Sequence, residues 1–194
     1  MNVVFIVLDT FRKDKMSVYN NEIDFTQNLE QFSENATVFE NAVSQAPWTL
    51  PSHASMFTGQ YPWEHGATQR KLYLETEKKL LAEKFEEKGY TTACYTTNTW
   101  LSPYTGMTKG FQEVDNFFGA LPSDVFSERM QSLWKRLNRG KGKWVKDKLI
   151  QAGEKLHWLD IGGKKTPELA RKAEKFVEEN QDDDFFLFLN FMDC

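Results

Sequence analysis

Two almost unbroken apolar runs, Val3–Leu8 and residues 185–194 (FFLFLNFMDC), stand out along the chain. A continuous apolar run is typical of a parallel strand that is covered on both faces of its sheet. Residues 36–44 and 90–97 are rich in β-branched and aromatic side chains, and we predict that they are strands as well.

Helical patterns separate these strands. Residues 25–32 carry apolar side chains at positions 25, 29 and 32, the spacing of one helix face. Pro51 starts a helix of small and apolar residues, and residues 77–88 form another helix that Gly89 ends. The strands alternate with helices, which predicts an α/β fold with a doubly wound, mostly parallel sheet flanked by helices.

A last helix begins at Thr166-Pro167-Glu168, where a capping hydroxyl precedes a proline and an acidic residue. Its predicted buried stripe consists of Leu169, Ala173, Phe176 and Val177. The predicted strand over residues 185–194 then reaches the last residue, so we expect the chain to be truncated and its site incomplete.

Composition and charge narrow the class of protein. The 194 residues are 40% apolar and 27% charged, which suits one globular domain, and the net charge of -4 gives no argument for nucleic acid binding. No apolar run approaches the roughly 18 residues of a membrane span. The two cysteines form no disulfide framework and no leader pattern precedes the first strand, so we expect a cytoplasmic protein.

Residues 121–165 differ from the rest because lysine, arginine and tryptophan crowd residues 129–155. We interpret this segment as an inserted helical subdomain with a solvated basic face. A lid that attracts anionic substrates or lipid headgroups is the alternative interpretation.

The candidate chemistry lies near two element ends. Asp9 follows the first strand, where its carboxylate could bind a divalent cation or cap the next turn. Thr49 precedes the helix of Pro51, where its hydroxyl could act as a nucleophile or as a helix N-cap. His53 and His65 could each be a core or surface histidine without a catalytic role. Asp9, Thr49 and the two histidines therefore indicate a function only in combination.

The combination resembles the sulfatase family of the alkaline-phosphatase superfamily. VVFIVLDTFRKDKMSVYN is similar to its opening strand and metal-binding segment, and FTQNLEQF is similar to the helix that follows. AVSQAPWTLPSHASMFTGQYPWEHG resembles the family signature around the nucleophile, and FFLFLNFMDC resembles a strand leading to a binding histidine. The resemblance covers nearly the whole chain except about residues 121–165, and implies that residues 1–194 are the N-terminal part of an alkaline-phosphatase-like catalytic domain.

The resemblance implies a role for each matching residue. Asp9 would be a metal ligand, and Thr49 would be the nucleophile and lie beside the metal. His53 stands where the family usually has an arginine that positions the nucleophile, so we expect a catalytic role for it. Ser52, like Ser55, matches a helix-start serine, and Asn98 lies where many members bind substrate; both Ser52 and Asn98 are candidate substrate-binding residues.

Three departures from the family pattern modify this picture. Thr49 replaces the cysteine or serine that becomes formylglycine, and threonine lacks the primary carbon that this oxidation requires, so no formylglycine is expected. Thr10 stands where many sulfatases have a second metal-binding aspartate. Residues 96–106 (TTNTWLSPYTG) replace the segment that carries the sulfate-binding lysine and histidine.

We therefore expect a hydrolase of sulfuric esters that depends on a divalent metal ion (Ca, Mg, Mn or Zn) and acts on a small anionic ester. A phosphodiesterase or phosphonate hydrolase of the same superfamily is one alternative, because such members use threonine. A non-catalytic sulfatase-like binding protein is the other. The family's further ligands include a histidine just beyond Asp193, so we expect residues 1–194 alone to be inactive and to bind metal weakly.

Overall fold

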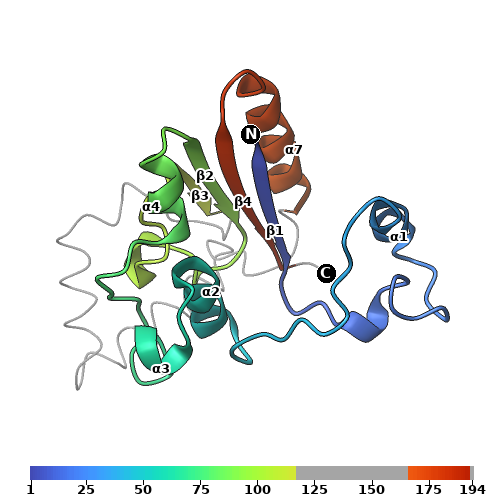
Figure 1. The fold of residues 1–194 in the computed structure, drawn as a ribbon, viewed down its shortest axis with the longest axis horizontal. Coiled ribbons are helices and arrows are strands. Elements are labelled where there is room, and N and C mark those ends of the chain that lie inside the picture. The colour runs from blue at the N-terminus through green and yellow to red at the C-terminus, as the bar shows by residue number, and fades with distance from the viewer. Residues whose placement is uncertain (117–165, 193–194) are drawn as a thin grey trace, which may run out of the picture.

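The computed structural model describes residues 1–116 and 166–192, which contain a four-stranded parallel sheet (Figure 1). Its strands are β1 (Val3–Leu8), β2 (Thr91–Thr96), β3 (Glu113–Asn116) and β4 (Phe185–Phe191), arranged in the order β1-β4-β2-β3. Because all the strands are parallel and β4 lies between β1 and β2, the carboxyl ends of these three strands meet at one edge of the sheet.

Helices cover both faces of the sheet. The helices are α1 (Gln27–Ser33), α2 (Thr49–Thr58), α3 (Pro62–His65), α4 (Leu81–Glu86) and α7 (Thr166–Glu179), with 3-10 turns η1 (Lys13–Lys15) and η2 (Pro103–Thr105). In Figure 1, α7 lies on one side of the sheet, and α2 and α4 lie on the other. The predicted α/β fold with a doubly wound parallel sheet is therefore confirmed.

Alternation along β4 explains the two-sided core. Phe186 and Phe188 point to one face, where they pack against Leu50, Ala54 and Phe57 of α2. The alternate residues of β4, Phe185, Leu187 and Leu189, point to the other face. They pack there against Leu169, Ala173 and Phe176 of α7. By the same alternation Asn190, two residues after Phe188, also faces α2.

Some predicted elements differ from those observed. The strand predicted at residues 36–44 is wrong: this segment forms turns and irregular chain, and Phe39 is 71% exposed. Strand formation requires a neighbouring backbone and a surface to pack on, and the segment has β-forming side chains without such a partner in the described part of the chain. The helix predicted at residues 77–88 is shorter, and the C-terminal strand ends at Phe191.

Two predictions concern residues outside the described ranges. The helical basic insertion predicted at residues 121–165 lies wholly there, as does Asp193. In the predicted helix at Thr166 the stripe Leu169, Ala173 and Phe176 is buried, whereas Val177 is 37% exposed.

Within residues 1–116 and 166–192, no helix has the length and apolar character needed to cross a membrane.

Candidate active site

A cluster of polar side chains lies at the carboxyl edge of the sheet. It consists of Asp9, Thr49, His53, Asn98 and Asn190, and we refer to it as the Asp9 cluster. These residues come from the ends of β1 and β4, the start of α2 and the loop after β2. The carboxyl edge of a parallel sheet is where open α/β proteins place their ligands.

Asp9 is the first residue after β1. Its backbone N–H donates to the carbonyl of Phe191 over 2.8 Å, which extends the pairing of β1 with β4 by one residue. Thr10 then has a φ of 65°, in the left-handed region that a β-branched residue rarely adopts. This turn takes the chain away from the sheet and leaves the Asp9 carboxylate at its edge.

Thr49 is the first residue of α2 and points its hydroxyl at Asp9. Its Oγ1 donates to Asp9 Oδ2 over 3.1 Å, whereas the N-cap residue is Trp48. The N-cap interpretation of Thr49 is therefore wrong, and the helix begins two residues before Pro51. Because Thr49 lies at the positive end of the helix dipole, negative charge on its oxygen is favoured there.

Asn98 donates to both of these residues. Its Nδ2 lies 2.9 Å from Asp9 Oδ2 and 3.1 Å from Thr49 Oγ1. Its Oδ1 accepts the backbone N–H of Trp100 over 2.9 Å, which fixes the amide with its NH2 group toward the cluster. Asn98 therefore presents a hydrogen-bond donor to the Thr49 oxygen.

His53 contacts the backbone of Thr49 and not its hydroxyl. The ring is 2% exposed, and its Nδ1 lies 2.9 Å from the Thr49 carbonyl. Burial lowers the pKa of His53, while the Thr49 carbonyl and the charge of Asp9 act in the opposite direction. A neutral ring that carries its proton on Nδ1 fits this arrangement, since a carbonyl oxygen only accepts.

Asn190, near the end of β4, joins the cluster although the sequence analysis did not select it. It is fully buried, and its Nδ2 lies 3.3 Å from His53 Nε2 and 3.4 Å from Asp9 Oδ2. A polar residue that interrupts an apolar run at the carboxyl end of a strand is the signal that could have found it.

The two serines of α2 lie apart from the Thr49 hydroxyl. Ser52 Oγ is 3.4 Å from the Thr49 carbonyl, and in the described chain no hydrogen bond joins it to Asp9. Ser52 and Ser55 line a cavity of about 390 Å³ beside residues 43–45 and Tyr61. Ser55 also contacts His65 Nε2 over 3.1 Å, which connects α2 to the end of α3.

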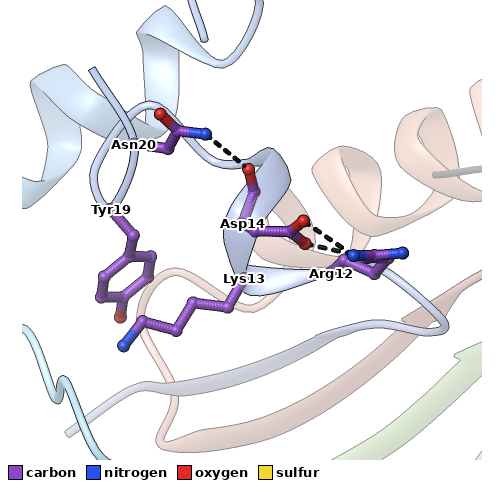
Figure 2. A pocket seen from close by; sticks show the side chains of 5 residues that line it. All are labelled: Arg12, Lys13, Asp14, Tyr19 and Asn20. Carbon is purple, nitrogen blue, oxygen red and sulfur yellow. Dashed lines mark hydrogen bonds and ion pairs between the residues drawn. The ribbon is translucent and has the colours of Figure 1, made fainter. Parts of the chain in front are cut away.

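A second hollow lies in the loop after β1, as Figure 2 shows. It has a volume of about 480 Å³ and is lined by Arg12, Lys13, Asp14, Tyr19 and Asn20. Arg12 forms two hydrogen bonds of 2.7 and 2.8 Å with the Asp14 carboxylate, and the hydrogen bond lowers the pKa of Asp14. The charge of Arg12 is thus already paired, and no hydrogen bond links it to the Asp9 cluster within the described ranges.

The Asp9 carboxylate and the Thr49 hydroxyl are both suitable oxygen ligands for a hard cation. Asn98 and Asn190 direct amide nitrogens toward Asp9, and an amide nitrogen is a donor group that does not bind such a cation. Residues 1–116 and 166–192 contain no group of three or more His, Cys, Asp or Glu side chains that could hold a metal ion. The described residues therefore contain two oxygen groups suited to a hard cation, on Asp9 and Thr49, and no complete ligand set.

The solved structure of a phosphonate monoester hydrolase of Agrobacterium radiobacter has a similar fold. The TM-score is 0.65 at 18% sequence identity, and the match covers 98% of this chain and 40% of that one. This likeness confirms the alkaline-phosphatase-like fold predicted from the sequence.

Curated relatives match a shorter part of the chain. An ulvan-active sulfatase of Formosa agariphila is 36% identical over 92 residues, which is 47% of this chain and 18% of that protein. An arylsulfatase of Clostridium perfringens is 32% identical over 94 residues, which is 48% of this chain and 20% of that protein. These matches span about a fifth of each relative. The family model described as Sulfatase matches residues 1–194, and the chain belongs to the sulfatase family.

Proposed function

We propose that the protein hydrolyses sulfuric esters with Thr49 as its nucleophile. The observation that carries this proposal is the hydrogen bond from Thr49 Oγ1 to Asp9 Oδ2 at the first residue of α2. A hydroxyl becomes a nucleophile when a neighbouring base accepts its proton, and Asp9 is such an acceptor. The family membership of the chain supports the substrate class.

In the proposed reaction, Thr49 Oγ1 attacks the sulfur atom while its proton passes to Asp9. The bond between sulfur and the ester oxygen breaks, and the leaving alcohol takes up the proton. Asn98 donates to Oγ1, and the positive end of α2 stabilises negative charge around it. Water then attacks the sulfur of the covalent intermediate and gives a proton to Asp9. The bond between sulfur and Thr49 Oγ1 breaks, that proton returns to Oγ1, and hydrogen sulfate is released.

The proposal includes a divalent cation of Ca, Mg, Mn or Zn beside Asp9. The Asp9 carboxylate and the Thr49 hydroxyl would be two of its oxygen ligands, and the others would come from outside the described residues. When bound, such a cation lowers the pKa of a coordinated hydroxyl and offsets the charge of an anionic ester.

Hydrolysis of a phosphodiester or phosphonate is the second candidate activity. Thr49 favours it because the superfamily members that use threonine are phosphodiesterases and phosphonate hydrolases, and a phosphonate monoester hydrolase shares the fold. Matched aryl sulfate and aryl phosphonate substrates, assayed with each of the four cations, separate the two activities. Cation binding without turnover of either substrate would instead indicate a non-catalytic binding protein.

The test of the nucleophile compares Thr49→Ala with Thr49→Ser in the full-length protein, because residues 1–194 alone are expected to be inactive. We expect Thr49→Ala to lose turnover while its thermal unfolding stays similar, and Thr49→Ser to retain turnover because it keeps a hydroxyl. Intact mass measurement checks that the introduced serine is not oxidised. Turnover by Thr49→Ala at the wild-type rate would exclude Thr49 as the nucleophile.

A further inference from the structure

The hydrogen bonds around Asn190 have a fixed direction. Thr96 Oγ1 accepts the backbone N–H of Asn98 over 2.9 Å, so its own proton is available for Asn190 Oδ1 at 3.2 Å. Because Oδ1 is the acceptor in that bond, the amide NH2 group of Asn190 must face the other way. There it meets two acceptors, His53 Nε2 and Asp9 Oδ2.

These two acceptors are the groups that hold Thr49. Asp9 Oδ2 accepts from the Thr49 hydroxyl over 3.1 Å, and His53 Nδ1 donates to the Thr49 carbonyl over 2.9 Å. Asn190 Nδ2 thus contacts both Asp9, which binds the side chain of Thr49, and His53, which binds its backbone.

We propose that Asn190, oriented by Thr96, is a positioning residue for Thr49. Asn190 and Thr96 are both fully buried, so neither touches the substrate, and their effect must pass through Asp9 and His53. The role rests on the proposed function of Thr49. It predicts that His53 carries its proton on Nδ1 and uses Nε2 to accept from Asn190.

His65 provides an internal comparison with the opposite arrangement. Its Nδ1 accepts the backbone N–H of Ala67 over 3.1 Å, which leaves the proton on Nε2, 3.1 Å from Ser55 Oγ. A long-range ¹H–¹⁵N spectrum distinguishes protonated from bare ring nitrogens. In the wild-type protein we expect a protonated Nδ1 for His53 and a protonated Nε2 for His65.

The variant Asn190→Leu keeps the size of the side chain and removes its donors. We expect the Nε2 resonance of His53 to shift because it loses a hydrogen bond, while the His65 resonances stay in place. We also expect kcat for the ester to fall by about 10- to 100-fold, the usual effect of losing an outer-shell partner, with KM changed by less than about threefold.

Thr96 supplies a second pair of variants in case Asn190→Leu does not fold. Thr96→Val removes the orienting hydroxyl and should reproduce both changes, whereas Thr96→Ser keeps the hydroxyl and should restore the wild-type spectrum and kcat. The proposal is overturned if wild-type His53 is protonated on Nε2. It is also overturned if Asn190→Leu or Thr96→Val folds but keeps the wild-type Nε2 resonance of His53 or the wild-type kcat. Turnover by Thr49→Ala would instead refute the proposed nucleophile, while the spectra still test whether Asn190 positions His53.

Discussion

Asn98 is the residue that joins the nucleophile to the carboxylate beside it. Its amide nitrogen lies within hydrogen-bonding distance of both Thr49 Oγ1 and Asp9 Oδ2. Its orientation does not depend on either of them, because the backbone N–H of Trp100 holds its oxygen. When the Thr49 oxygen gains negative charge, a donor is therefore already in place.

We predict that Asn98→Ala lowers kcat by about 10²- to 10³-fold, the effect of removing one preorganised donor from a reacting oxygen. The measurement is steady-state turnover of an aryl sulfate by the purified variant of the full-length protein. Asn180→Ala is the matched control and should leave kcat unchanged, because the Asn180 side-chain amide donates to the Phe176 carbonyl in α7 and, within the described residues, to no member of the Asp9 cluster. A kcat of Asn98→Ala within twofold of wild type would contradict this role.

Single residues were predictable where they follow a strand or begin a helix. Asp9 and Thr49 occupy such positions, and the structure brings them together with Asn98. Asn190 carried a local signal as a polar residue in an apolar run, but its place beside Asp9 and His53 depends on the pairing of β4 with β1 and β2, and on the helix that covers that face. Pairing between strands at opposite ends of the chain is not visible in a local pattern.

At the scale of elements, two glycines with the same backbone conformation have different surroundings. Gly89 and Gly110 both have a φ of 82°. An added Cβ at Gly89 would meet nothing within 4 Å, whereas at Gly110 it would lie 2.5 Å from the Cα of Glu83 in α4. Gly110 therefore allows the chain before β3 to approach the α4 backbone closely.

Alanine substitutions at Gly89 and Gly110 separate the cost of backbone strain from the cost of crowding against α4. Gly89→Ala should lower the free energy of unfolding by about 1 kcal/mol, the cost of placing a Cβ in the left-handed region. Gly110→Ala should lower it by about 2–4 kcal/mol, because overpacking against a rigid helix adds to that strain. Urea denaturation of the two variants measures the difference, and equal losses of stability would show that α4 moves aside without cost.

The elements predicted best were those with long, regular patterns. The apolar runs gave β1 and β4, and Thr166-Pro167-Glu168 marked the start of α7. β3 was not predicted, because Glu113–Asn116 has no apolar run and becomes a strand by pairing with β2. Residues 36–44 show the converse, since strand-forming side chains alone do not supply a partner.

At the scale of the whole molecule, two buried histidines make stability depend on pH. Burial is the largest cause that lowers the pKa of His53 and of His65. Both rings are therefore neutral in the folded protein at pH values where the unfolded chain, with an ordinary pKa near 6.5, already binds protons.

We predict that the free energy of unfolding is flat above about pH 6.5 and falls as the pH is lowered from there toward the folded-state pKa values. Urea denaturation between about pH 5 and 8 measures this dependence. His65→Asn keeps an acceptor for the Ala67 N–H and removes one titrating ring, so its stability should vary less over the acidic range. An identical pH dependence in wild type and His65→Asn would contradict the assignment.

The Asp9 cluster has one further consequence, which concerns the order of events in catalysis. Asp9 is its only charged member, since its partners are a hydroxyl, two amides and a neutral imidazole. An anionic ester approaching Thr49 would meet this negative charge without compensation from within the cluster. If a cation at Asp9 offsets this charge, as the proposed function includes, we expect compulsory-order kinetics in which the ester adds second.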